Sequence, residues 1–322
     1  MKITLFIVLT PLHVYITKIL IKYLDIVDYK ILTTNKYINY FNTKDSMIFD
    51  IAELQESRIK KLLKLLKLKF TIKQQRFNKV FIPSDANPYI QVVLKKIIFD
   101  ELNYFEEGGT LLYRIKENVS NKPQIKKSFV KKMLGINDID NVLKDTRIQN
   151  AYVFFPKLLK TFTKNINLID LSPIINNTII EEVNIDEKYF NPDILIFTQP
   201  LTEDGYCKNY DEIKVIEEFI KNNQDKNIII KLHPRDKIKS YDYLKKYDII
   251  FMPDIYQTIP YQIMHARINP VIIVSFFSSI LFSVPSIRKD FKRISLINYI
   301  DNQDVQNVVR EIEKVLIDLE RI

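Results

Sequence analysis

Short apolar runs rich in β-branched and aromatic residues recur along the chain and alternate with longer segments of helical spacing. In the first half the runs are ITLFIVLT, YKILTT, KVFIP and LNYFEEG, and YIQVVLKKIIFD is one of the segments between them. Short, continuous apolar runs are typical of strands that are buried on both faces. Their alternation with helices predicts a parallel sheet that is covered by helices.

The alternation stops near residue 155 and begins again near residue 191. In this second part DILIFTQP, NIIIKLHP, DIIFMP and NPVIIVSF predict strands, and EIKVIEEFI and YQTIPYQIMHA predict helices. We therefore predict two α/β domains, 1–155 and 191–322, with a linker region at 156–190 and a cleft between the domains. A chain of 322 residues is long enough for each domain to bury a core of its own.

The segment RIKKLLKLLKLKF, Arg58 to Phe70, combines apolar residues at helical spacing with a series of lysines. Its predicted apolar face consists of Ile59, Leu62, Leu63 and Leu66. Two interpretations stay open. In the first, which we favour, this face packs into the core and the lysines are solvated. In the second, the helix docks on a membrane surface, as basic interfacial helices do.

Composition narrows the classes of partner. The chain carries 48 Lys and Arg against 39 Asp and Glu, a net charge of +9, which favours nucleic acid, an anionic membrane or a negatively charged small substrate. Basic and aromatic residues do not interleave as they do in RNA-binding sheets, so nucleic acid is disfavoured. With only four glycines and no glycine-rich phosphate motif, the chain is neither a dinucleotide-binding nor a P-loop enzyme.

Two features bear on location. The single cysteine, Cys207, excludes a disulfide framework and fits a reducing compartment. Pro11 and His13 interrupt the N-terminal apolar run before it is long enough to span a membrane, so we interpret it as a buried first strand. We expect a cytoplasmic protein, with peripheral contact to the inner face of the cell membrane under the second interpretation of Arg58 to Phe70.

Polar residues follow several predicted strands, and ligands of open α/β sheets bind at the carboxyl ends of the strands. In KLHPR, His233 stands at such an end, Pro234 prevents further ladder pairing, and Lys231 and Arg235 flank the imidazole. A lone histidine is usually structural, but this one is among only three and lies at a strand end. Its cationic surroundings predict a phosphate-binding site.

SFFSS also follows a strand, and the apolar segment after Ser278 and Ser279 predicts a helix that begins there. Hydroxyls and free N–H groups at a helix N-terminus bind anions without a metal. An ordinary serine N-cap is the commoner explanation of such a pair, and KLHPR in the same domain favours the phosphate interpretation. Gln199, at a strand end, and His13, after the first strand, are further candidates with equally good structural explanations.

FEEGG lies in the other domain, directly after a predicted strand. Glu106 and Glu107 repel one another, which raises the pKa of one carboxyl group and suits it to act as a general base. Gly108 and Gly109 allow a substrate to approach the backbone closely. A polar hairpin turn is the alternative.

These motifs together resemble those of the bacterial sialyltransferases. Glu106-Glu107-Gly108, His233-Pro234 and Ser278-Ser279 stand in the order of an acidic-pair motif, an HP motif and a paired-serine motif. TPLH and FTQPL further resemble glycosyltransferase family 52, which includes lipooligosaccharide and capsule sialyltransferases. The resemblance spans most of the chain. Two glutamates replace the commoner acidic pair that contains aspartate.

The resemblance implies a GT-B fold, with two Rossmann-like domains that face a central cleft. It implies inverting transfer of N-acetylneuraminic acid from CMP-Neu5Ac to a terminal galactose of a bacterial surface glycan, either lipooligosaccharide or capsule. By this analogy Glu107 deprotonates the acceptor hydroxyl, His233 protonates or hydrogen-bonds the departing phosphate, and Ser278 and Ser279 hold that phosphate. Another nucleotide sugar is the alternative donor, because family 52 has members that transfer other sugars.

No metal cofactor is expected. The one D-x-D sequence, Asp138-Ile139-Asp140, is better interpreted as a helix start, and no histidine pair has zinc-ligand spacing. The C-terminal segment DVQNVVREIEKVLIDLERI predicts an amphipathic helix that packs on either domain or on a second copy of the chain in a homodimer. A non-catalytic basic protein that binds nucleic acid or membrane is the remaining alternative.

Overall fold

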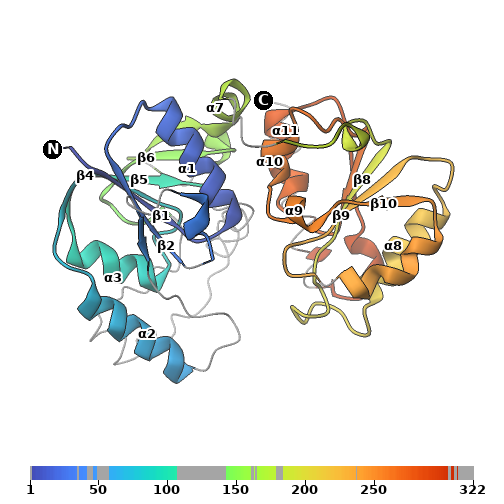
Figure 1. Ribbon diagram of the computed structural model, residues 1–322, viewed down its shortest axis with the longest axis horizontal. Helices are drawn as coiled ribbons and strands as arrows, with labels where there is room; N and C mark the ends of the chain where they lie inside the picture. Colours follow the sequence, from blue (N-terminus) through green and yellow to red (C-terminus); the bar gives the residue numbers. More distant parts are fainter. Residues whose placement is uncertain are drawn as a thin grey trace. The chain divides into compact units, whose positions relative to one another are not determined.

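The chain forms two compact units, Met1–Thr178 and Ile179–Ile322, each built on a parallel sheet (Figure 1). The structure is a computed structural model. It describes residues 2–34, 36–41, 46–48, 58–106, 143–160, 163, 165–178, 184–236, 238–303, 306–307 and 310.

The first unit contains a seven-stranded sheet of order β3-β2-β1-β4-β5-β6-β7, in which every neighbouring pair is parallel. The strands are β1 (Thr4–Val8), β2 (Tyr29–Thr33), β3 (Ser46–Ile48), β4 (Arg76–Ile82), β5 (Ile98–Phe105), β6 (Ile148–Val153) and β7 (Asn167–Asp170). The helices are α1 (Pro11–Tyr23), α2 (Arg58–Thr71), α3 (Pro88–Lys96), α6 (Pro156–Lys160) and α7 (Leu171–Asn177), and η1 (Ile38–Tyr40) is a 3-10 turn.

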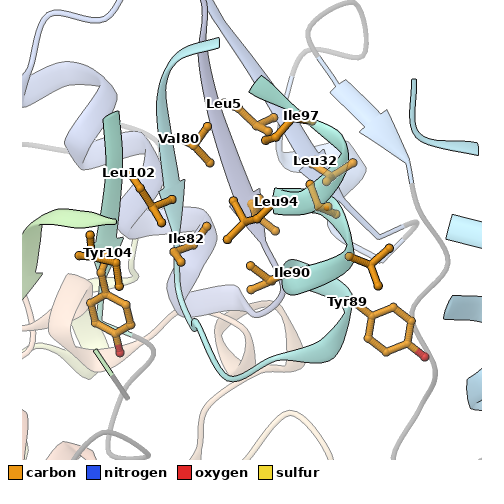
Figure 2. Packing of buried hydrophobic residues seen from close by; sticks show 14 of the residues in the cluster. Leu5, Leu32, Val80, Ile82, Tyr89, Ile90, Leu94, Ile97, Leu102 and Tyr104 are labelled. Atoms are coloured by element: carbon orange, nitrogen blue, oxygen red, sulfur yellow. The ribbon is translucent and has the colours of Figure 1, made fainter. Parts of the chain in front are cut away.

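Two helices of this unit begin with the same combination of residues. The side chain of Thr10 accepts the N–H of His13 at the start of α1, and that of Asn87 accepts two N–H groups at the start of α3. In each case a proline follows the cap, where its missing N–H costs nothing. The buried face of α3 then packs on β1, β4 and β5, and Figure 2 shows Ile90 and Leu94 facing Ile82 and Val80.

The second unit contains a five-stranded sheet of order β10-β9-β8-β11-β12, again with every neighbouring pair parallel. Its strands are β8 (Ile194–Phe197), β9 (Ile228–Lys231), β10 (Ile249–Phe251), β11 (Ile272–Ser275) and β12 (Lys292–Ser295). Its helices are α8 (Asp211–Lys221), α9 (Asp254–Gln257), α10 (Tyr261–Met264) and α11 (Ile280–Ile287), with 3-10 segments η3 (Glu187–Tyr189), η4 (Ile238–Lys246) and η5 (Ile297–Tyr299).

All eight predicted strands are present, and the parallel α/β class is confirmed. The helix predicted over YIQVVLKKIIFD ends earlier, because its last residues begin β5. YQTIPYQIMHA forms two short helices rather than one, since Pro260 interrupts the segment and caps the second. Asp138–Asp140 and nearly all of the predicted C-terminal helix lie outside the described residues.

The boundary between the two units lies further along the chain than residue 155. β7 and α7, which fall in the predicted linker 156–190, continue the first sheet and its helical layer, and the first unit reaches Thr178. The sequence did not predict β7 because it is a short edge strand with half-exposed and exposed side chains. Such a strand lacks the continuous apolar run by which a buried strand is identified.

Candidate active site

Three loops of the second unit meet at one edge of its sheet. β8, β9 and β11 are parallel, and β8 pairs with both of the others, so their carboxyl ends lie at the same edge. Gln199 follows β8, His233 follows β9, and Ser278 follows β11. This edge is where open α/β sheets bind their ligands, and the candidates that sequence analysis placed in this domain gather there.

Side-chain hydrogen bonds tie the three loops to one another. The N–H of His233 donates to Thr198 Oγ1 at 2.8 Å, which joins the loop after β9 to the loop after β8. Gln199 Oε1 accepts the N–H of Phe277 at 2.8 Å and the hydroxyl of Ser275 at 3.3 Å, which joins the loop after β8 to the loop after β11. Gln199 therefore links the loop after β8 to the loop after β11 and helps to fix the position of Ser278.

The imidazole of His233 is held in one tautomer. Its Nδ1 accepts the N–H of Arg235 at 3.1 Å, so in the neutral ring the proton is on Nε2. Burial, and then the positive charges of Arg235 and Lys231, lower the pKa of His233 to about 4. At neutral pH the residue is thus an uncharged donor that presents Nε2–H.

A half-buried carboxylate, that of Asp236, holds the turn that carries His233. Asp236 Oδ2 accepts hydrogen bonds from the Thr198 hydroxyl, from the N–H of His233 at 3.2 Å and from the Tyr241 hydroxyl at 3.4 Å. Burial raises the pKa of Asp236 to about 6 although the bond from Thr198 opposes it. Sequence analysis missed Asp236; its only signal is an acidic residue three positions after His233.

The two cations that flank His233 have different surroundings. Lys231 is 5% exposed, its Nζ donates to the carbonyl of Gln257 at 2.8 Å, and burial lowers its pKa to about 7. Arg235 forms two bonds with the carboxylate of Asp204, at 2.6 and 2.7 Å. The charge of its guanidinium is therefore neutralised, while Lys231 lies buried at the strand end and is only partly protonated at neutral pH. Pro234 lies exposed in the turn between them.

The paired serines lie where α11 begins, as predicted. Ser278 Oγ accepts the N–H of Ile280 at 3.5 Å, and Ser279 stands at the N-cap position without a capping bond from its side chain. Both side chains are half-buried. A half-buried hydroxyl that is not used as a cap, at the N-terminal end of a helix, fits a bound anion.

A model of glycosyltransferase family 52 matches residues 23–299. The chain belongs to glycosyltransferase family 52. None of the curated proteins compared with it matches.

Solved structures with the same fold include sialyltransferases. A 2,6-sialyltransferase from a Vibrionaceae Photobacterium species, in a ternary complex with the donor product CMP and the acceptor substrate lactose, is similar with TM-score 0.60, 11% identity, and coverage of 97% of this chain and 76% of that one. The GT-B domain of a Photobacterium damselae sialyltransferase is similar with TM-score 0.56 and 12% identity, and the match covers 98% of this chain and 97% of that one. A Neisseria meningitidis UDP-GlcNAc 2-epimerase bound to UDP-GlcNAc is similar with TM-score 0.50 and 13% identity, and the match covers 98% of this chain and 91% of that one. The fold of this family 52 chain is therefore of the GT-B type.

The first unit of the family 52 chain carries the acidic pair, of which only one member is described. Glu106 is 1% exposed; its carboxylate accepts the N–H of Phe154 at 3.2 Å, and its own N–H donates to the carbonyl of Tyr152 at 2.9 Å. It thus joins the ends of β5 and β6. Glu107 and Gly108 lie outside the described residues.

His13 lies near the same strand end, in the first turn of α1. Its Nδ1 accepts the N–H of Leu9 at 3.1 Å, and its ring meets the ring of Phe105 edge-on at 5.5 Å. Burial lowers its pKa to about 3, and its buried Nε2 has no hydrogen-bond partner among the described residues. His13 is therefore a neutral residue whose ring packs the start of α1 against the end of β5.

Proposed function

We propose that this family 52 glycosyltransferase is an inverting, metal-independent sialyltransferase, which moves N-acetylneuraminic acid from CMP-Neu5Ac to a terminal galactose of lipooligosaccharide or capsule. The observation that carries the proposal is the set of groups at one edge of the second sheet. There a fixed Nε2–H of His233, the hydroxyls of Ser278 and Ser279, and the buried amine of Lys231 can all donate hydrogen bonds. Such a site suits the phosphate of a departing nucleotide.

On the donor side, the glycosidic bond to phosphate breaks and negative charge develops on the phosphate oxygen of CMP. His233 donates its Nε2 proton in a hydrogen bond to that oxygen. The bound phosphate itself raises the pKa of the imidazole above the value of the free protein, because a neighbouring anion favours the charged ring. Ser278 and Ser279 hold the other oxygens, while Gln199 and the Arg235–Asp204 pair keep the loops in place.

On the acceptor side, Glu107 is the proposed general base. It accepts the proton of the galactose hydroxyl as that oxygen attacks the anomeric carbon from the face opposite CMP, which gives inversion. Glu106 is less suited to this role, because Phe154 donates to its buried carboxylate. Gly108 follows Glu107 and leaves room for the acceptor.

The relatives support this choice of donor and acceptor, and also define the alternative. One Photobacterium sialyltransferase of similar fold was solved with CMP and lactose, while the Neisseria epimerase of similar fold was solved with UDP-GlcNAc. An inverting transferase with a different nucleotide sugar is therefore the second candidate. A homodimer, formed through the C-terminal segment, remains a prediction from the sequence.

Nucleotide selectivity tests the proposal. Purified protein is titrated by calorimetry with CMP, CDP and UDP, each with and without EDTA, and CMP-Neu5Ac turnover is then followed with and without lactose. We expect CMP to bind selectively and lactose to accelerate CMP release, in both cases unchanged by EDTA. Preference for UDP or CDP would establish the alternative donor. Activity lost in EDTA and restored by a metal would contradict the metal-independent mechanism.

A further inference from the structure

Helix α2 packs one face against the first unit. Leu65 and Leu68 are 9% and 4% exposed and belong to the core cluster shown in part in Figure 2, with Leu62 and Leu66 partly buried beside them. α2 contacts α3, and Figure 1 shows it at the periphery of this unit. The favoured interpretation of this segment, a core helix, is therefore correct for these leucines.

A second apolar stripe of α2 is not part of that core. Ile59, Leu63 and Phe70 are 71%, 58% and 80% exposed. They are four and seven residues apart, so at about 100° per residue they share one side of the helix, away from Leu65 and Leu68. The sequence prediction of a single apolar face was wrong, because it combined Ile59 and Leu63 with leucines that pack inward.

A row of lysines runs beside the exposed stripe. Lys60, Lys64 and Lys67 follow one another at helical spacing, and Lys60 and Lys67 are exposed. Side by side, an exposed apolar stripe and a lysine row form the pattern of helices that lie in the interface of an anionic bilayer. The apolar side chains enter the acyl boundary, and each lysine near the anionic surface adds to the attraction.

Charge decides between the candidate occupants of this surface. A symmetric dimer in which the two copies of α2 pack antiparallel through the stripe would bring their lysine rows together on one side, where they repel. Nucleic acid would be attracted to the positive charge of the lysines but leave Ile59, Leu63 and Phe70 in water. An anionic bilayer accommodates both the apolar stripe and the lysine row. The net charge of +9 adds long-range attraction to such a bilayer. None of the described helices is both long and apolar enough to span a membrane, so the contact would be peripheral.

We propose that α2 docks the first unit on the surface of an anionic phospholipid bilayer. Ile59, Leu63 and Phe70 enter the boundary between headgroups and acyl chains, and Lys60, Lys64 and Lys67 lie at the lipid phosphates. If the proposed function also holds, this docking holds the enzyme at the surface where lipid-linked glycan acceptors lie. The docking itself does not depend on which sugar is transferred.

The test uses the full chain and vesicles of defined composition. Co-sedimentation is measured with vesicles of phosphatidylcholine alone and with vesicles that contain 30% phosphatidylglycerol, each at low and high salt. The variant is Ile59→Ser/Leu63→Ser/Phe70→Ser, which changes exposed positions only. The matched control is Ile255→Ser/Val271→Ser/Tyr299→Ser, at positions 71%, 60% and 69% exposed in the second unit. Lys60→Glu/Lys67→Glu tests the electrostatic part.

We expect binding to the anionic vesicles that weakens with salt, a loss of about tenfold or more in the partition coefficient for the α2 variants, and wild-type binding for the control. CMP-Neu5Ac turnover with soluble lactose is measured in parallel, so that failure of docking and failure of the proposed function are separate results. No binding to anionic vesicles, or equal binding by the two triple variants, would overturn the proposal. A changed oligomeric state of the α2 variant without vesicle binding would identify a protein interface instead.

Discussion

Replacement of Asp236 by asparagine should make the second unit more stable, with a gain that depends on pH. Asp236 Oδ2 accepts three hydrogen bonds beneath the turn that carries His233, and an asparagine oxygen accepts from the same donors. The substitution therefore removes the charge and keeps most of the hydrogen bonding. Because a buried charge is costly even when it is hydrogen-bonded, the loss of that charge should dominate.

The size of the effect follows from the pKa. Burial raises the pKa of Asp236 from 3.8 to about 6, and each unit of difference between the folded and unfolded states corresponds to about 1.4 kcal/mol, so the ionised carboxylate costs about 3 kcal/mol. The folded state binds more protons than the unfolded state between these two pH values. Wild-type stability therefore falls as pH rises from about 4 to about 6. Below this window Asp236→Asn should match the wild type, and above it the gain should be complete.

Local unfolding is the appropriate measurement, because the chain has two units and no tryptophan. Pulsed hydrogen exchange in a urea series, read by mass spectrometry on peptides of β8 and β9, gives the unfolding free energy of the second unit at pH 4, 5, 6 and 7.5. The difference between variant and wild type should increase with pH to about 3 kcal/mol. A difference that is constant across these pH values, or that decreases with pH, would refute the reasoning.

Three further substitutions test the site. His233→Ala should lower kcat by roughly 10²- to 10⁴-fold, whereas His233→Gln, which keeps a side-chain N–H donor, should lose less; equal losses would contradict the role of donor. Glu107→Gln should cost a similar factor in turnover and leave CMP affinity unchanged in calorimetry, and near-normal turnover would remove Glu107 from the base role. Burial holds the pKa of Lys231 near 7, below its ordinary 10.5. Lys231→Met should therefore be more stable than the wild type at pH 7, and this gain in stability should shrink as the pH rises towards 10.5. The same variant should bind CMP more weakly. Unchanged CMP affinity in that variant would place Lys231 outside the nucleotide site.

Most of the strands that sequence predicted contain a short apolar run; β10 has such a run although it is an edge strand, and the interior strand β6 was missed although it is mostly buried. β1, β8 and β9 are buried along their whole length and read as unbroken apolar runs. β7 and β12 are edge strands with exposed positions, and nothing in their composition separates them from a loop. They become strands because a neighbour offers free N–H and C=O groups, and that neighbour lies far away in the sequence.

The candidate site likewise has features that the sequence predicts and contacts that it does not. The positions of His233 and Ser278 beyond strand ends could be predicted because each follows an apolar run that was identified as a strand. The contacts that fix them could not, since Thr198 and Asp236 are 38 residues apart and meet only through the pairing of β8 with β9. The tautomer of His233 likewise depends on the conformation of the turn that brings the N–H of Arg235 to Nδ1.

The hydrogen-bonded link that Gln199 forms between two loops has a consequence for how this site can be altered by protein engineering. Because Gln199 bonds the loop after β11 while Thr198 bonds the turn after β9, the lengths of the three loops are mutually constrained. An inserted or deleted residue in any one loop would displace residues of the other two. The proposed nucleotide site is therefore more open to side-chain exchange at fixed loop length than to loop grafting, and a graft would have to transfer all three loops together.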